Sequence, residues 1–151
     1  MKFRVVVVGR ARDASLAGAI ADYEARAARY WPLEVHEVRE EAGRDAALVR
    51  AREGERLLAR ASGALLVACD ERGEVMTSAV FAAWMQGLRE SARDVSFVVG
   101  GAHGLDAAVR AAAGRVLSLA PWTLPHELAR LVLAEQLYRA GTIVRREPYH
   151  K

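Results

Sequence analysis

Five short apolar runs alternate with helical segments along this chain, and that alternation constrains its fold more than any other feature. Several of the runs are nearly continuously apolar rather than alternating, as expected for strands that are covered on both faces. The pattern predicts an α/β domain with a mainly parallel sheet. The expected strands are Phe3–Val8, Leu33–Val38, Ala64–Cys69, Val95–Val99 and Val116–Leu119.

Apolar residues between these runs recur at helical spacing, so each longer intervening segment predicts a helix packed on the sheet. The strongest helix starts near Pro125, a residue tolerated in a first helical turn, and runs towards Gly141. Residues 142–151 are mostly polar and show no helical period. Because no linker or repeat divides the chain, we expect one domain over residues 1–151 with a short basic tail over residues 142–151.

Composition narrows the class of protein. With 52% apolar residues, the chain can bury a core without disulfides or a structural metal. Its single cysteine, Cys69, excludes an internal disulfide framework and leaves too few thiols for a cysteine-based zinc site. The apolar run Val5–Val8 is too short for a signal peptide or a membrane span. We therefore expect a cytoplasmic protein with no metal and no membrane association.

The net charge of +3 is gathered at the C-terminal end. From Leu128 onward there are five basic residues and two acidic ones, which leaves 17 of each for the rest of the chain. Only Lys2 and Lys151 among the 22 basic residues are lysines, and arginine binds phosphate bidentately and stacks on bases. The clustering favours a surface for phosphates, whereas the preference for arginine is also what GC-rich coding produces.

Two loops at the ends of expected strands are candidate binding sites. A buried strand runs into the glycine-rich turn 100–104, and glycine lets the backbone approach a ligand at the carboxyl end of a sheet. The turn matches neither the dinucleotide fingerprint nor a P-loop. The loop from Leu119 to Leu124, followed by Pro125, is rigid and mostly apolar, and it suits a flat group such as adenine. The alternative interpretation of the glycine turn is a tight strand-to-helix connection. The alternative interpretation of the loop is a hydrophobic cap on the core.

Motifs spread over the whole chain resemble the RlmH family, the ribosomal RNA large-subunit pseudouridine N3-methyltransferases. In order they are Ala21-Asp22-Tyr23-Glu24, Glu53-Gly54-Glu55-Arg56-Leu57-Leu58, Val98-Val99-Gly100-Gly101-Ala102-His103-Gly104-Leu105, Leu117-Ser118-Leu119, Thr123-Leu124-Pro125-His126, Ala134-Glu135-Gln136-Leu137-Tyr138-Arg139-Ala140 and Pro148-Tyr149-His150-Lys151. Cys69, where many relatives have leucine, and His103, at a variable position, depart from the pattern.

The resemblance implies a SPOUT α/β fold with a deep C-terminal trefoil knot, a homodimer, and S-adenosyl-L-methionine as the cofactor. It implies methylation of N3 of a pseudouridine in 23S ribosomal RNA, within the assembled ribosome. The cofactor site would lie in the knot. The residues implied to line that site are Cys69, Gly100, Leu119, Ala120, Pro121, Trp122, Thr123 and Leu124.

Methylation at N3 requires a proton to leave a weakly acidic imide nitrogen, so we expect a general base or a group that stabilises the anion. His126 and Arg130 share a helical face, either as an anion-binding pair or as a surface pair. Glu135 and Arg139 have the same spacing, and a helix-stabilising ion pair is the alternative to a catalytic role. The catalytic candidates are His126, Glu135, Arg139, Tyr149 and His150.

The tail is expected to act on RNA, because it combines phosphate contacts, a stacking ring and a titratable group. A frayed terminus is the alternative. The expected RNA contacts are Arg130, Arg145, Arg146 and Lys151, and Tyr149 would stack on RNA or close over the active site.

A second functional class is a non-catalytic RNA-binding or ribosome-associated factor that uses the same basic tail. Such a factor would need no cofactor pocket, so the two candidate loops favour the enzyme. A nucleotide-dependent oxidoreductase is disfavoured because the dinucleotide fingerprint and its acidic ribose ligand are both missing.

Overall fold

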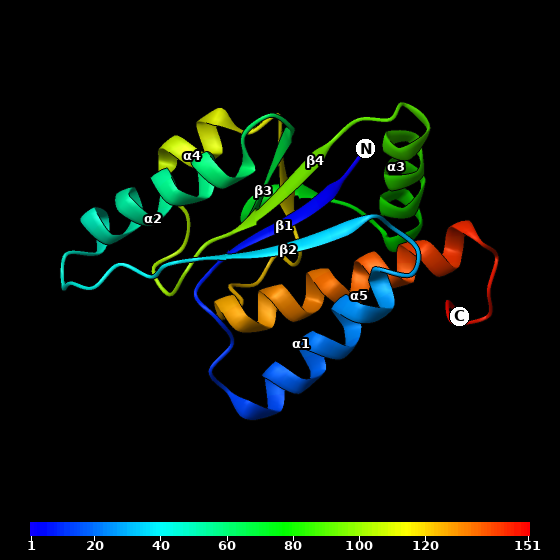
Figure 1. Cartoon of the computed structure of the whole chain (residues 1–151), viewed down its shortest axis with the longest axis horizontal. Coiled ribbons are helices and arrows are strands. Elements are labelled where there is room, and N and C mark those ends of the chain that lie inside the picture. Colours follow the sequence, from blue (N-terminus) through cyan, green and yellow to red (C-terminus); the bar gives the residue numbers. More distant parts are fainter.

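Five parallel strands form one sheet in the order β2-β1-β4-β3-β5 in the computed structural model, which describes residues 1–151 (Figure 1). All four strand pairings are parallel. The predicted α/β fold with a parallel sheet is therefore confirmed. The strands are β1 (Phe3–Val8), β2 (Leu33–Val38), β3 (Leu65–Val75), β4 (Val95–Val99) and β5 (Arg115–Ser118).

Side-chain caps mark where three of the helices begin. Asp13 and Asp45 each accept two backbone amides of the following first turn, and Thr77 accepts one. No helix is both long and apolar enough to cross a membrane. The helices are α1 (Ala14–Ala27), α2 (Ala46–Ala61), α3 (Ser78–Glu90), α4 (Ala107–Ala112) and α5 (His126–Val144).

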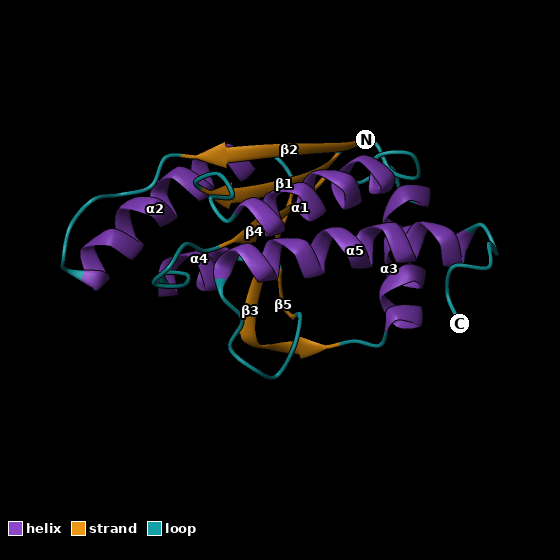
Figure 2. Ribbon diagram, turned by 90° about the horizontal axis from the view of Figure 1, so that it is seen from below, coloured by secondary structure: helices purple, strands orange, loops and turns teal.

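Helices cover both faces of the sheet, and two apolar clusters fill the spaces between the layers. Helices α1, α3 and α5 contribute to the larger cluster, and α2 and α4 to the smaller one. Alternate residues of β1 divide between them, with Val5 and Val7 on the first face and Val6 and Val8 on the second. Figure 2 shows α5 lying beside α1 on one side of the sheet.

Strand β3 continues six residues beyond its predicted end at Cys69. Its pairing with β5 breaks register after Cys69 and resumes where Glu74 pairs with Leu117. The intervening charged residues and Gly73 read as a turn in the sequence, but they form a bulge that stays on the sheet. A Cβ on Gly73 would lie 2.6 Å from the backbone of Val116, so the two chains approach too closely for a side chain. Bulges of this kind redirect side chains beside functional sites.

Helix α5 ends at Val144, three residues beyond the predicted limit near Gly141. Thr142 is fully buried, and its hydroxyl donates to the carbonyl of Arg139 at 2.7 Å, so a polar residue is accommodated inside the helix. The predicted tail boundary at residue 142 was therefore wrong, and the tail begins at Arg145. The trefoil knot that the resemblance implies stays a prediction.

Trp31 joins α5 to the sheet. Its side chain is 1% exposed, its indole N–H donates to the carbonyl of Leu137 at 2.8 Å, and its ring meets the Phe3 ring edge-on. Replacing Trp31 by Phe should lower the free energy of unfolding by about 1 to 3 kcal/mol, because a buried carbonyl loses its donor and a cavity opens. Chemical denaturation measures this, with half-buried Trp84→Phe as the matched control. Equal losses in the two variants would contradict the role of the hydrogen bond.

Candidate active site

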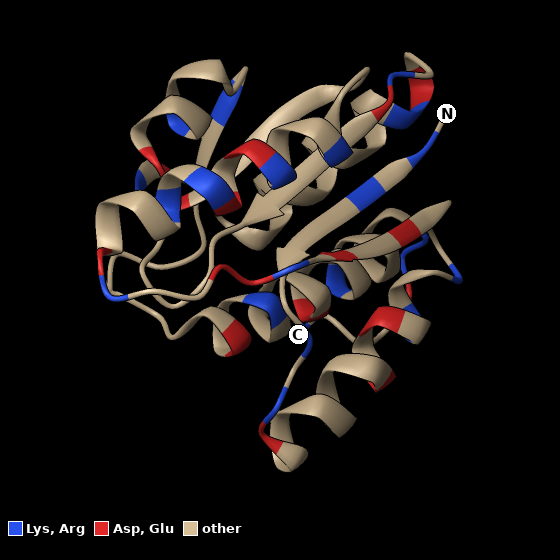
Figure 3. Cartoon of the chain, turned by 60° about the vertical axis from the view of Figure 1, so that its left-hand side comes forward, with Lys and Arg blue, Asp and Glu red and all other residues tan.

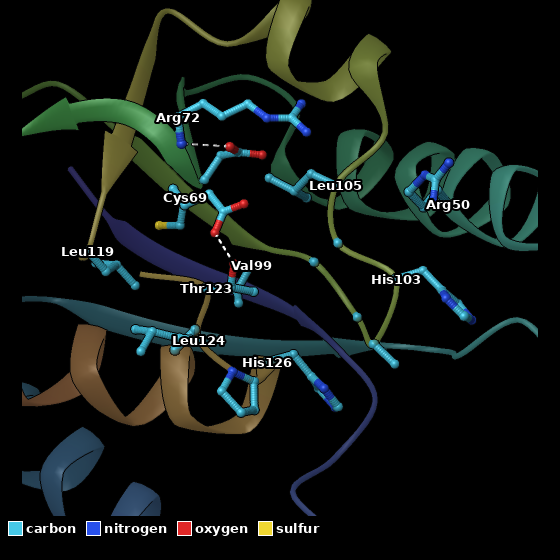
Figure 4. A pocket seen from close by; sticks show the side chains of 18 of the residues that line it. Arg50, Cys69, Arg72, Val99, His103, Leu105, Leu119, Thr123, Leu124 and His126 are labelled. Carbon is cyan, nitrogen blue, oxygen red and sulfur yellow. Dashed lines mark hydrogen bonds between the residues drawn. The ribbon is translucent and has the colours of Figure 1, made fainter. Parts of the chain in front are cut away.

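A cleft of about 960 Å³ opens where β3, β4 and β5 end (Figure 4). Three segments line most of it: the start of the β3 bulge, the glycine turn, and the loop that leads into α5. Helix α2 adds Arg50, and α4 adds Arg110. Of the eight residues expected to bind a cofactor, the structure brings seven to this cleft, and Pro121 is not among the lining residues. The seven are Cys69, Gly100, Leu119, Ala120, Trp122, Thr123 and Leu124.

The two ends of the cleft differ in chemistry. Leu119, Leu124 and Cys69 lie towards one end, whereas Arg50 and His103 lie at the other (Figure 4). A flat apolar group therefore suits the first end, and a charged or strongly hydrated group suits the second.

The glycine turn closes on itself so tightly that its first residue has no room for a side chain. The amide of Gly104 donates to the carbonyl of Gly101 at 3.0 Å, and Gly104 has a φ of +81°. A Cβ on Gly100 would lie 2.6 Å from the carbonyl carbon of Gly104. Backbone, rather than side chain, therefore forms this wall of the cleft.

Both walls leave backbone amides unpaired. In the glycine turn, the amides of Gly100, Ala102 and His103 donate to no other backbone group, whereas Gly101 forms an antiparallel bridge with Gly104. The amides of residues 119–124, where Pro121 has none, also donate to no other backbone group. Backbone N–H groups normally find a partner when they are taken out of water. The cleft therefore presents a set of fixed donors to whatever fills it.

Side-chain hydrogen bonds fix the three segments relative to one another. Thr123 donates its hydroxyl to Glu71, which ties the loop of residues 119–125 to the β3 bulge. Arg110 lies 3.4 Å from Asp70 and donates to the carbonyl of Leu105 at 2.9 Å, which ties the bulge to the segment after the glycine turn. These contacts hold the walls of the cleft together.

His126 is the one catalytic candidate that lines the cleft. It is the first residue of α5 and is half-buried. Its neighbour Glu127 turns away and accepts the amides of Arg12 and Asp13, which holds the start of α5 against the segment before α1. His126 is therefore held at the edge of the cleft by a fixed backbone.

The other four catalytic candidates form a separate cluster at the far end of α5. Arg139 pairs with Glu135 at 2.6 Å, and it lies over the ring of Tyr149, 4.8 Å from the ring centre. Tyr149 donates its hydroxyl to Glu135 at 3.0 Å, and His150 lies 3.5 Å from Arg139. Glu135 follows His126 by nine residues, which is about 13 Å along a helix. In one chain, the cluster therefore does not reach the cleft.

Burial and hydrogen bonding perturb the ionisable groups of this cluster. Burial, followed by hydrogen bonds with Tyr23 and Glu135, raises the pKa of Tyr149 well above its usual range. The hydrogen bonds to Glu135 raise the pKa of Arg139. Tyr149 is therefore a neutral hydrogen-bond donor at physiological pH, and Arg139 stays charged.

Arg130 does not face solvent, so its predicted RNA contact is wrong. The residue is 9% exposed, and its guanidinium group pairs with Glu24 at 2.7 Å and with Glu37 at 3.1 Å. Burial acts to lower the pKa of Arg130, but the hydrogen bonds to the two carboxylates outweigh burial and raise it. The same contacts leave no anion-binding pair with His126, because the charge of Arg130 is already neutralised.

The tail is anchored rather than frayed. Arg145 lies over the ring of Tyr30, 4.7 Å from its centre, and Tyr30 donates its hydroxyl to Glu147. Arg145, Arg146 and Lys151 are exposed, as an RNA contact requires. Figure 3 shows that basic residues also occur on other helices and strands, where acidic residues accompany them.

Comparison with known proteins identifies the family. Residues 1–150 match the family described as predicted SPOUT methyltransferase. A ribosomal RNA large subunit methyltransferase H of Gemmatimonas aurantiaca is 64% identical over 154 residues and covers the full length of both chains. One of the same name from Pelobacter propionicus is 47% identical and covers 99% of each chain. This chain belongs to the SPOUT methyltransferase family.

Solved structures agree with this assignment at the level of the fold. A probable methylase family protein from Haemophilus influenzae superposes with a TM-score of 0.60 at 13% identity, over 99% of this chain and 70% of that one. A probable methyltransferase from Bordetella pertussis gives a TM-score of 0.52 at 16% identity, over 91% of this chain and 95% of that one. The resemblance to the RlmH family is confirmed by the relatives named ribosomal RNA large subunit methyltransferase H, and the chain is similar in length to them.

Some residues that line the cleft of this SPOUT methyltransferase were not foreseen from the sequence. Arg50 is far from the glycine turn along the chain, and only the packing of α2 places it there. Asp70, Glu71 and Arg72 follow a buried strand directly. That position at the carboxyl end of a strand was the signal that could have identified them.

Cys69 should be an unusually unreactive thiol for a residue that lines a cleft. Burial, helped by the charge of Asp70, raises the pKa of the thiol from 9.0 to about 12, so the reactive thiolate is about a thousandfold scarcer at pH 8. Because the pKa is raised, alkylation should be slow at pH 8 and should accelerate as the pH rises towards 12. Mass spectrometry after iodoacetamide treatment measures the rate, with free cysteine as the control. If Cys69 and free cysteine were alkylated at comparable rates at pH 8, the burial of this thiol would be contradicted.

Proposed function

We propose that this chain is an S-adenosyl-L-methionine-dependent methyltransferase that modifies N3 of a pseudouridine in 23S ribosomal RNA within the assembled ribosome. The observation that carries the proposal is a cleft between the glycine turn and the loop before α5, walled in part by amides with no backbone partner, in a chain of the SPOUT methyltransferase family. The name shared by its relatives supports large-subunit ribosomal RNA as the substrate. The motifs shared with the RlmH family support pseudouridine.

The residues of the cleft fit the cofactor. Backbone amides of the loop at Leu119–Leu124 can read the polar edge of adenine, while Leu119 and Leu124 cover its faces. Because Gly100 has no side chain, the opposite wall of the cleft can approach the cofactor closely. When bound, the cofactor supplies a methyl group that is already activated by a positively charged sulfur.

The protein must then align the acceptor nitrogen, exclude water and receive a proton. His126 at the edge of the cleft is the proton acceptor that one chain can provide by itself. Tyr149 cannot act as a base at physiological pH, because its pKa is raised, so it serves as a hydrogen-bond donor. Glu135 and His150 are the alternative acceptors, with Arg139 to stabilise the anion.

A symmetric homodimer would allow both groups of residues to act together. In one chain, about 13 Å of helix separates His126 from the cluster around Glu135. A two-fold axis places the same surface of each chain against the other, so the tail of one copy can approach the cleft of its partner. We therefore propose that the active enzyme is a homodimer and that Arg145, Arg146 and Lys151 contact RNA beside the cleft.

Replacing Gly100 by Ala should weaken S-adenosyl-L-methionine binding by about tenfold or more. A Cβ there would collide with the backbone of Gly104, so the turn must shift, and a loss of 1.4 kcal/mol in binding is about tenfold in affinity. Isothermal titration measures the affinity. Gly87→Ala in α3 is the matched control, since nothing lies within 4 Å of the added methyl group. Unchanged affinity in a folded Gly100→Ala protein would contradict this site, and no binding by the parent protein would favour a non-catalytic RNA-binding factor.

Removal of Pro148–Lys151 should abolish methyl transfer to ribosomes and leave cofactor binding intact. The deletion removes Tyr149 and His150 but touches no residue that lines the cleft. Arg145→Ala with Arg146→Ala should instead weaken ribosome binding and reduce its salt dependence, by about 0.7 to 0.9 in slope for each lost phosphate contact. Filter binding and a radiolabelled methyl-transfer assay separate the two effects. If the shortened protein transferred methyl groups at the parent rate, the tail would have no catalytic role, and His126 and the cleft would be sufficient.

A further inference from the structure

The only buried carboxylate in the protein lies directly behind the glycine turn. Glu53 on α2 is 4% exposed, and no other acidic side chain is buried. One of its oxygens accepts the amide of Glu41 at 3.1 Å, whereas the other, Oε1, has no hydrogen-bond partner. No cation neutralises it, because the nearby Arg56 pairs with Glu41 and with the carbonyl of Arg39. A buried carboxylate with an unused acceptor is costly to maintain and calls for a functional explanation.

The unused oxygen is directed at Gly101. A Cβ on Gly101 would lie 2.8 Å from Oε1 of Glu53 and 3.4 Å from its Cδ, so the carboxylate fills the space that a side chain would need. Gly101 also lines the cleft. A single thickness of backbone therefore separates the carboxylate from the ligand space.

The position of Oε1 connects Glu53 to the cleft. No hydrogen bond ties this oxygen to the turn, and the backbone at Gly101 lies between it and the ligand space. A carboxylate in this buried position makes the turn side of the cleft more attractive to positive charge, because little solvent screens it.

We infer that Glu53 is a positioning residue that lets the cleft distinguish a cationic cofactor from its uncharged product. This inference rests on the proposed function. S-adenosyl-L-methionine and S-adenosylhomocysteine differ in one methyl group and in the positive charge on sulfur. A negative charge behind the wall of a poorly solvated cleft stabilises the first ligand and not the second. The product is then released more readily after transfer.

The test compares the affinities of both ligands for the parent protein and for Glu53→Gln. Glutamine keeps the shape of the side chain and removes its charge. We expect S-adenosyl-L-methionine to bind about fivefold to tenfold more weakly, and S-adenosylhomocysteine to change by less than about twofold. The melting temperature should stay the same or rise, because a buried unpaired charge is removed. Glu55→Gln, an exposed position on the same helix, is the matched control and should leave both affinities unchanged.

A merely structural role would not change the ratio of the two affinities. If Glu53→Gln weakens both ligands equally, or neither, the inference is overturned. Glu53→Leu provides a second variant without the charge, and it must show the same loss of discrimination. If the parent protein binds neither ligand, both the proposed function and this inference fail. If it binds both and the ratio is unaffected by the substitutions, the inference alone fails.

Discussion

The pairing of β3 with β5 across a break in register is the constraint on which the candidate site depends. The close approach of Gly73 to the backbone of Val116 keeps the bulge on the sheet. The bulge in turn places Glu71 where it can accept the hydroxyl of Thr123 and hold the loop before α5. The glycine turn after β4 supplies the facing wall. Three segments that are distant in sequence thus form one cleft.

Much of this arrangement could be predicted from the sequence, because it follows from local patterns. Apolar runs indicated five strands, and the carboxyl ends of parallel strands meet at one edge of a sheet. The glycine turn and the loop at Leu119–Leu124 were therefore expected to be neighbours, and they are. The extension of β3 was not predictable, since charged residues beside Gly73 are typical of turns. Only the partner strand shows that pairing resumes at Glu74 and Val75.

The sequence did not predict which ion pairs and hydrogen bonds form between residues that are distant along the chain. Counting charges placed Arg130 on a basic surface, but two carboxylates from α1 and β2 neutralise it. Helical spacing correctly paired Glu135 with Arg139, yet it did not show that this pair lies outside the cleft, with Glu135 nine residues along α5 from His126. Glu53 was only part of a family motif in the sequence. Its buried, unpartnered oxygen is apparent only when α2 is packed against the glycine turn.

In the proposed function, the cleft of this methyltransferase binds the cofactor and the tail acts on ribosomal RNA. The most direct test is mass spectrometry of 23S ribosomal RNA digests, after ribosomes that lack the modification are incubated with the protein and S-adenosyl-L-methionine. We expect one added methyl group, located on N3 of a single pseudouridine. An unmodified 23S RNA, or a methyl group on another nucleoside, would contradict it.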